Sequence, residues 1–391
     1  MFPRLTSLCV LACIALCIPG CKPAATPGTP SPPSTTGDIV IGHYASITGP
    51  EATFGVSTDN GVKLAVEEIN AAGGFKGRQL RVLTYDDKSD AKEVGQAVTK
   101  FVTSDKVTAV IGEVASSLSL VAGPICQKYS VPMISPSSTN TQVTEVGDMI
   151  SRVCFIDPFQ AYVCAKFARE HERVKASKAA ILFAQDQAYS VQLKEEFEKW
   201  FTQFGGTITD VQTYIKGDQD FSAQLTAIRG TSPDVIFIPG YYTDVGNIAL
   251  QARALNIKVP LLGGDGWDSD KLAEIAGKAI DGCFYSNHYS PEDPNPKVQA
   301  FLKKYKEKFG STPDGLAALG YDSAWILFRA MEKSPDLAGA NLAKAIAETK
   351  DFDGVTGKIT IDAKRDAVKP AVILEMKDGQ RKFLTTIEPQ R

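Results

Sequence analysis

The chain has 391 residues, more than one hydrophobic core usually supports, so we expect two domains. Its 42 Lys and Arg are balanced by 45 Asp and Glu, and the formal charge is -3. These charges are spread evenly and form no basic stripe that could hold a phosphate backbone, which excludes nucleic acid as a partner.

The first 20 residues predict a signal peptide. Arg4 is followed by an almost unbroken apolar run from Leu8 to Ile18, too short to span a membrane as a helix. The run ends in Ile18-Pro19-Gly20-Cys21, which resembles a bacterial lipoprotein cleavage site. We therefore expect an exported protein, periplasmic or at the cell surface, anchored to the membrane by a lipid on Cys21. The alternative is an ordinary secretory signal in which Cys21 is incidental.

Residues 21–37 predict a flexible tether. They are rich in Pro, Thr, Ser, Ala and Gly and cannot bury enough apolar surface to fold. The folded part then contains four cysteines, Cys126, Cys154, Cys164 and Cys283. In an oxidising compartment they permit three pairings, among which the sequence does not choose. None of them forms a CxxC pair, which argues against a zinc or redox site.

From residue 38 onward, short apolar runs alternate with amphipathic stretches of helical period. This pattern is typical of parallel sheets covered by helices on both faces. We expect strands at 39–45, 80–85, 107–111 and 132–135, with helices at 59–71, 91–104 and 117–129. The alternation restarts with strands at 179–184, 208–214, 235–239 and 260–262 and helices at 190–204, 222–229 and 245–255. The fold class is therefore α/β, with two doubly wound parallel-sheet lobes.

The last third of the chain predicts helices with few strands of their own. Helical patterns cover 296–309, 316–333 and 341–348, and strand-like runs cover 283–289, 358–361 and 371–376. We expect this tail to return to the two earlier lobes and complete them.

Open parallel sheets bind ligands beyond the carboxyl ends of their strands. The segments that follow the expected strands are 46–54, 113–119, 135–140, 185–189, 240–243 and 263–267. They contain hydroxyls and aromatic rings but almost no histidine, which indicates binding more than catalysis.

The polar residues in these segments suit a small zwitterionic ligand such as an amino acid. Its carboxylate and its ammonium must both be hydrogen-bonded when they leave water. Ser116 and Ser117 open a helix, where hydroxyls and free N–H groups can receive a carboxylate. The run Ser137-Ser138-Thr139 offers carbonyls and hydroxyls to the ammonium and an N–H to the carboxylate. The alternatives are a simple helix cap at Ser116 and a polar turn after Pro136.

The second lobe supplies an acid and aromatic rings. Asp265, between glycines, is the acid placed to face an ammonium. Tyr189 and Tyr241 follow two second-lobe strands, Phe54 lies in the loop after the first strand, and Trp267 is next to Asp265. Aromatic residues in such places can also simply pack.

These residues stand in a longer pattern. It comprises Ile47-Thr48-Gly49-Pro50, Asn60-Gly61, Glu68-Ile69-Asn70-Ala71-Ala72-Gly73-Gly74, Lys76-Gly77-Arg78, Tyr85-Asp86-Asp87, Val110-Ile111-Gly112, Pro132-Met133-Ile134-Ser135-Pro136, Asp220-Phe221-Ser222, Pro233-Asp234-Val235-Ile236-Phe237 and Gly240-Tyr241. From residue 38 to the C-terminus, this collinear pattern resembles the branched-chain amino-acid-binding proteins of ABC transporters.

The resemblance implies a type I periplasmic-binding fold, in which the chain crosses three times between the lobes. Lobe 1 would be residues 38–157 and 284–363, and lobe 2 residues 158–283 and 364–391. The implied function is to capture a small amino acid, aliphatic or branched-chain, by closing the lobes and to deliver it to the permease of an ABC transporter.

The resemblance also implies roles for individual residues. Ser116, Ser137 and Thr139 occupy the positions that hold the ligand's carboxylate and amino group, and Tyr189 and Tyr241 match second-lobe tyrosines. This chain departs from the leucine/isoleucine/valine-binding members in having Asp265 for a glutamate and Phe54 for a tyrosine. It also lacks their first-lobe cysteines, since Ser89 and Ala115 stand there.

Three other functions compete with this one. A hydrolase would need a nucleophile and a base, but the chain has three histidines and no GxSxG motif, so we expect no enzyme. A ligand sensor would share the fold. A third possibility is the same fold binding an amide, a urea or an aromatic acid. We expect neither a metal nor a cofactor, because the acidic turn at 86–90 departs from an EF-hand and no nucleotide-binding glycine motif occurs.

Overall fold

The computed structural model describes residues 37–389. The expected signal peptide at 1–20, the lipidation site Cys21 and all of the expected tether except Gly37 lie outside the described residues.

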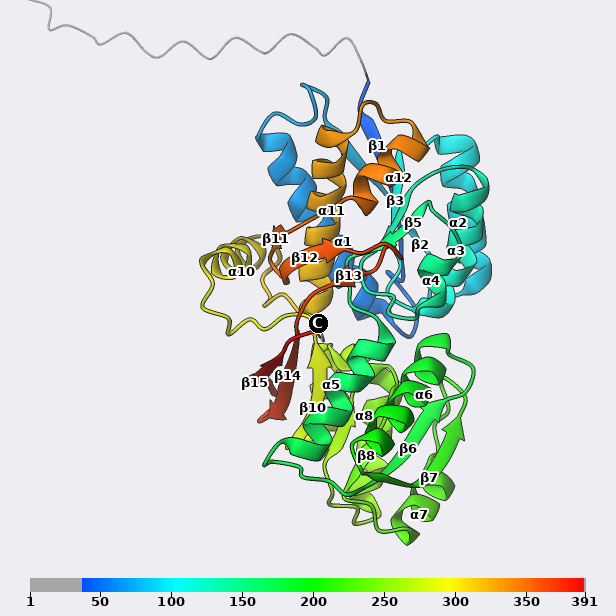
Figure 1. Ribbon diagram of the computed structural model, residues 1–391, viewed down its shortest axis with the longest axis vertical. Helices are drawn as coiled ribbons and strands as arrows, with labels where there is room; N and C mark the ends of the chain where they lie inside the picture. Colours follow the sequence, from blue (N-terminus) through cyan, green and yellow to red (C-terminus); the bar gives the residue numbers. More distant parts are fainter. Residues whose placement is uncertain (1–36, 390–391) are drawn as a thin grey trace, which may run out of the picture. The chain divides into compact units, whose positions relative to one another are not determined.

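The first sheet has five parallel strands in the order β2-β1-β3-β4-β5 (Figure 1). These strands are β1 (Ile39–Ala45), β2 (Leu80–Asp86), β3 (Ala109–Ile111), β4 (Met133–Ser135) and β5 (Ile150–Arg152). The helices between them are α1 (Ala52–Ala71), α2 (Ala91–Lys100) with a further turn η1 (Phe101–Asp105), α3 (Ser116–Lys128) and α4 (Gln142–Glu145). Strand β5 was not predicted, because a strand of three residues is too short to show an alternating pattern.

Helix α1 begins seven residues earlier than expected. Residues 52–58 carry no apolar stripe, but Gly55 lets this turn lie against the end of β1. A Cβ at Gly55 would stand 2.1 Å from the carbonyl oxygen of Ser46. Phe54 consequently belongs to the first turn of α1 and not to a loop, which corrects that expectation.

The second sheet repeats the strand order of the first. Its order is β15-β14-β10-β9-β8-β6-β7, so its five parallel strands, β7-β6-β8-β9-β10, correspond to β2-β1-β3-β4-β5. The strands are β6 (Lys178–Ala184), β7 (Thr207–Tyr214), β8 (Val235–Phe237), β9 (Leu261–Gly263), β10 (Cys283–Asn287) and the antiparallel β14 (Ala371–Lys377) and β15 (Gln380–Ile387). The accompanying helices are α5 (Asp157–Glu170), α6 (Ala188–Gln203), α7 (Ser222–Gly230), α8 (Tyr242–Ala254) and α9 (Asp270–Ala276), with the turns η2 (Asp265–Trp267) and η3 (Gly277–Ile280). The prediction of two parallel-sheet lobes is confirmed.

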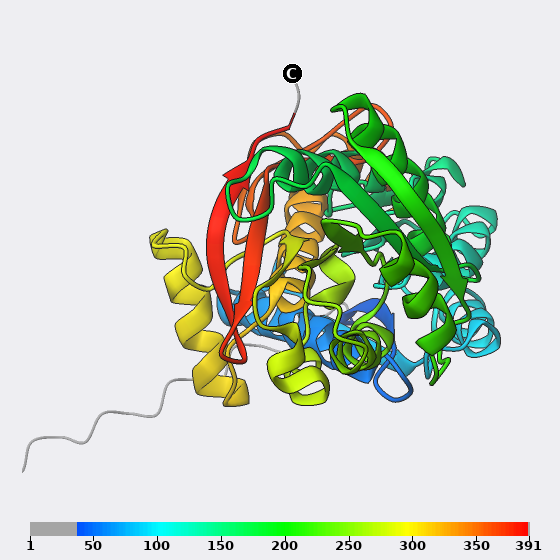
Figure 2. The ribbon, with the colours of Figure 1, turned by 90° about the horizontal axis from the view of Figure 1, so that it is seen from below.

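The tail returns to both lobes, as expected. Helix α10 (Pro296–Phe309), α11 (Gly315–Lys333), α12 (Gly339–Ala347) and a small antiparallel sheet join the first lobe, and β14 and β15 extend the second sheet (Figures 1 and 2). The small sheet contains β11 (Phe352–Gly354), β12 (Gly357–Ile361) and β13 (Ala367–Val368). The chain crosses between the lobes after β5, after β10 and after β13.

The second and third crossings lie a few residues later than the expected bounds. Strand β10 belongs entirely to the second sheet, so the crossing follows Asn287 and not Cys283. Strand β13 pairs with β12, so the last crossing follows Val368 and not residue 363. Strand pairing, which sequence pattern does not report, decides both positions.

Helices α1 and α11 approach each other closely through glycines. A Cβ on Gly61 would lie 2.0 Å from the carbonyl oxygen of Ala317, and one on Gly320 would lie 2.5 Å from that of Thr58.

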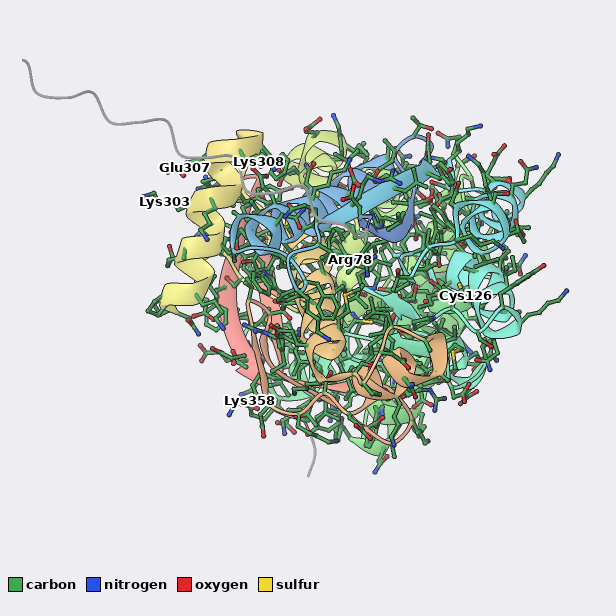
Figure 3. The ribbon with its side chains drawn as sticks, turned by 90° about the horizontal axis from the view of Figure 1, so that it is seen from above. Arg78, Cys126, Lys303, Glu307, Lys308 and Lys358 are labelled. Carbon is green, nitrogen blue, oxygen red and sulfur yellow. The ribbon has the colours of Figure 1, made fainter. Side chains whose placement is uncertain are left out.

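Figure 3 views this lobe from above and shows α10 at its edge, with Lys303, Glu307 and Lys308 on that helix.

All four cysteines of the folded part are free and buried. Burial raises the pKa of the thiols of Cys126 (Figure 3), Cys154 and Cys164 to about 12, so they are inert thiols at neutral pH. Within residues 37–389, no helix is both long and apolar enough to cross a membrane.

Candidate functional site

The strand ends of the two lobes meet through aromatic side chains. Phe54 of α1 packs edge-on against Tyr241 and Tyr242, with ring centroids 5.8 and 4.9 Å apart. Tyr241 in turn stacks on Tyr189, with centroids 5.4 Å apart. Phe54, Tyr189 and Tyr241, predicted from three separate segments, therefore lie in one cluster between the sheets.

Two first-lobe hydroxyls in this region are buried without a partner. Ser137 Oγ and Thr139 Oγ1 make no hydrogen bond with any residue that the structure describes, and their residues are 3% and 1% exposed. A buried hydroxyl without a partner is unfavourable in the protein alone. Both hydroxyls are therefore free to bind a polar ligand.

Ser116 lies beside them at the start of α3. Ala115 is the N-cap, so Ser116 is the first helical residue and its hydroxyl is not a cap. This hydroxyl accepts the Asn140 N–H at 3.3 Å. It shares the first turn of α3 with N–H groups that have no intrahelical partner, an arrangement that suits an anion.

Three other predicted residues have protein partners instead. Ser138 Oγ donates to the carbonyl oxygen of Glu113 at 2.9 Å, and Ser117 Oγ accepts the N–H of Ala188 from the second lobe at 3.0 Å. The indole N–H of Trp267 donates to the carbonyl oxygen of Ile238 at 3.0 Å, and the ring is fully buried. These contacts give all three residues a structural role, and we leave Trp267 out of the proposed ligand contacts.

Asp265 is buried and hydrogen-bonded at both oxygens. Gln160 Nε2 donates to Oδ1 at 2.8 Å, and His288 Nε2 lies 3.0 Å from Oδ2. Neither partner was predicted from the sequence. His288 directly follows β10, whereas the strand was expected to continue to residue 289. Had the strand been expected to end at Asn287, His288 would have been among the candidate residues that follow a strand.

A second carboxyl group, Asp157, was also missed. Its residue is fully buried, and neither carboxyl oxygen has a hydrogen-bond partner among residues 37–389. Burial raises the pKa of Asp157 well above its ordinary value; the nearby Thr139 hydroxyl opposes this effect, and the charge of Asp265 adds to it. The Asp157 N–H donates to the Thr139 carbonyl oxygen at 2.9 Å, which places this residue next to the free hydroxyls. The Asp-Pro pair at the start of α5 was the available sequence signal.

Glycines allow the backbone to approach the tyrosines. A Cβ on Gly264 would stand 2.3 Å from the Tyr189 hydroxyl, which accepts the N–H of Gly266 at 3.3 Å. Tyr241 OH has no hydrogen-bond partner in the described part of the chain. The site thus combines free hydroxyls with two buried carboxyl groups.

The rim of this region holds the lobes together. Tyr242 OH and Thr243 Oγ1 both donate to the carbonyl oxygen of Pro50, at 2.9 and 3.1 Å. The hydroxyls of Thr53 and Ser269 are 2.8 Å apart. The lobes therefore touch directly around the candidate site.

Residues 37–389 contain no cluster of His, Cys, Asp or Glu that could hold a metal ion.

The pattern of the family described as "Periplasmic binding protein" matches residues 38–381. A Leu/Ile/Val-binding protein homolog of Brucella abortus is 32% identical over 88% of this chain and 91% of its own. These relatives are binding proteins and not enzymes, which confirms the expectation that this chain is not an enzyme.

Solved structures agree with the fold. A leucine binding protein of Thermotoga maritima is 38% identical, with a TM-score of 0.86 over 90% of this chain and 99% of that one. A branched-chain amino acid transporter substrate binding protein of Streptococcus pneumoniae, solved with isoleucine, is 32% identical, with a TM-score of 0.85 over 90% of this chain and 100% of that one.

Proposed function

Because this chain belongs to the periplasmic binding protein family, we propose that it captures a small aliphatic or branched-chain amino acid and delivers it to the permease of an ABC transporter. The named ligands of its relatives, leucine, isoleucine and valine, support this ligand class. We further propose that a lipid on Cys21 holds the exported protein at the membrane, with residues 21–37 as tether. The lobes would then be residues 38–157 with 288–368, and 158–287 with 369–391.

One observation carries the proposal. The Ser137 and Thr139 hydroxyls are buried without a hydrogen-bond partner among the described residues, and Thr139 is next to the carboxyl group of Asp157, which lies near Asp265. Hydroxyl donors suit a carboxylate, and the Asp265 carboxylate suits an ammonium. A ligand with both groups on one carbon matches this pairing.

Binding would proceed in two stages. Ser116, Ser137 and Thr139 of the first lobe receive the carboxylate. Closure then brings Asp265 and the rings of Tyr189 and Tyr241 onto the other side of the ligand. Contacts that exist only in the closed form shift the population towards it. Several charge-assisted hydrogen bonds, offset by ordering and desolvation, correspond to dissociation constants of about 1 µM or lower.

Calorimetry with matched ligands tests this function. The protein should bind leucine, isoleucine or valine, and should bind 4-methylpentanoate, which is leucine without its amino group, far more weakly. Asp265→Ala should reduce leucine affinity much more than 4-methylpentanoate affinity. Equal losses for both ligands would remove Asp265 from the ammonium site, and the absence of binding to any amino acid would refute the ligand class.

The anchor has its own test. Replacing Cys21 with Met should move the protein from the detergent phase to the aqueous phase after expression in a host that processes lipoproteins. Unchanged partitioning would favour the ordinary secretory signal.

A further inference from the structure

The side chains of Gln160 and His288 hold the Asp265 carboxylate at the hinge end of the second lobe. Gln160 lies in the first turns of α5, just after the first crossing, and His288 starts the second crossing. Gln160 Nε2 donates to Asp265 Oδ1 at 2.8 Å, and His288 Nε2 lies 3.0 Å from Oδ2. Gln160 and Asp265 belong to the second lobe and His288 directly follows β10 of that lobe, so the three residues meet at the hinge.

The His288 ring is fixed by packing. It stacks on Phe155 of the first crossing, with centroids 3.6 Å apart and planes inclined by 26°, and the residue is 3% exposed. Its Nε2 faces Asp265, and its Nδ1 has no hydrogen-bond partner among the described residues. The packing therefore keeps Nε2 of His288 directed at the Asp265 carboxylate.

The charge balance of Asp265 depends on the protonation of His288. Among the described residues, His288 is the only basic side chain within 4.0 Å of the Asp265 oxygens. A neutral donor orients a carboxylate but leaves its negative charge for a ligand. A protonated His288 would neutralise that charge and repel a ligand's ammonium.

We propose that Gln160 and His288 are positioning residues that make the site selective for ligands with an amino group, and that His288 does so only as the neutral ring with its proton on Nε2. This inference rests on the proposed function. Burial lowers the pKa of His288, Asp265 opposes this by raising it, and the more distant Lys369 and Asp268 lower and raise it respectively. As pH falls through this pKa, the cation forms and affinity for amino acids falls.

The first experiment needs no ligand, so it stands even if the proposed function fails. Nitrogen-15 NMR of labelled histidine rings reports tautomer and charge, and variants at His171 and His288 assign the signals among the three histidines. His288 should be neutral at pH 7 with the proton on Nε2, and Asp265→Asn should lower its pKa further. A cationic His288 at pH 7, or a proton on Nδ1, would overturn the proposal.

The second experiment measures binding by calorimetry from pH 7.5 down to below the His288 pKa that the NMR titration gives. His288→Leu should weaken leucine binding about tenfold and leave 4-methylpentanoate within about twofold. His288→Gln restores a donor that cannot titrate, so at pH 7.5 it should recover most of the affinity and should lose less of it on acidification than the wild type. His171→Gln, at the C-terminal end of α5, is the matched control and should behave as the wild type. Equal weakening of both ligands by His288→Leu, or a His288→Gln profile identical to the wild type, would contradict the assignment.

Discussion

The ammonium group of Lys216 lies 2.9 Å from the carboxylate of Glu51, and this ion pair joins the second lobe to the first. The Glu51 side chain is 4% exposed and that of Lys216 is 17% exposed, so water screens the pair only weakly. Together with the hydrogen bonds to Pro50 from Tyr242 and Thr243, it closes the rim of the candidate site.

Removing this pair should destabilise the closed form. In Lys216→Met, closure would bury the Glu51 charge without its partner, so we expect about tenfold weaker amino-acid binding, mainly through faster dissociation. Stopped-flow displacement measures that rate. Lys199→Met, which removes an exposed lysine paired with Glu196 on one helix, is the control and should change the rate less than about twofold. An unchanged dissociation rate in Lys216→Met would show that the pair does not act as a latch.

Thr139 and Ser138 are adjacent hydroxyl residues that should respond in opposite ways. Thr139→Val removes a hydroxyl that has no partner among the described residues, so it should leave stability nearly unchanged and weaken leucine binding about 10- to 100-fold. Ser138→Ala removes hydrogen bonds to buried carbonyl oxygens of Glu113 and Val114, so it should lower the free energy of unfolding by about 1–3 kcal/mol. Urea denaturation and calorimetry on both variants separate the effects. If Ser138→Ala weakened leucine binding and Thr139→Val lowered the free energy of unfolding, Ser138 would be the ligand contact and Thr139 the structural residue.

Arg152 and Asp366 form a buried ion pair next to the site. Arg152 Nε lies 2.7 Å from Asp366 Oδ1, with side chains 0% and 6% exposed. Arg152→Met leaves the Asp366 charge buried and unpaired, so the free energy of unfolding should fall by about 3–5 kcal/mol.

Restoring charge balance provides the control for this pair. In the double variant Arg152→Met with Asp366→Asn, the loss of unfolding free energy, measured by urea denaturation, should be smaller than in Arg152→Met alone. Equal losses would mean that Arg152 stabilises the fold through its other contacts, such as its 3.0 Å hydrogen bond to Thr144 Oγ1.

Asp244 should make stability fall as pH rises. Burial raises its pKa to about 7, whereas an unfolded aspartate ionises at about 4. Between these values the folded state binds more protons than the unfolded state, so this group's contribution to unfolding free energy decreases with rising pH and is fully lost above about pH 7. The free energy of unfolding, measured by denaturation at pH 5.5 and at pH 8.0, should differ less between the two pH values for Asp244→Asn than for the wild type. If the two proteins show the same difference, Asp244 ionises normally.

The sequence predicted most of the fold because the long elements carry periodic patterns. Strand β1 and helix α10 begin and end at the expected residues, and the other expected strands differ from the observed ones by no more than two residues at either end. Short elements such as β5 were missed, since three residues do not define a period. The beginning of α1 was missed because contact with the end of β1, through Gly55, sets it.

For the site, residues next to long strands were the ones that could be named. Phe54, Tyr189 and Tyr241 do lie together, and Asp265 is buried beside Tyr189. Asp157 and Gln160 were not named because they lie after the first crossing, where no strand was expected to end, and His288 was not named because the end of β10 was expected two residues too late.

The sequence by itself determined the two α/β lobes, the returning tail and the family resemblance, because hydrophobic period and collinear motifs are local properties of the chain. Only the tertiary structure decided which polar atoms are left without partners. Hydrogen bonding depends on neighbours that are distant in sequence, as Ser138 and Thr139 demonstrate: adjacent residues of similar chemistry, one bonded to the segment after β3 and the other free.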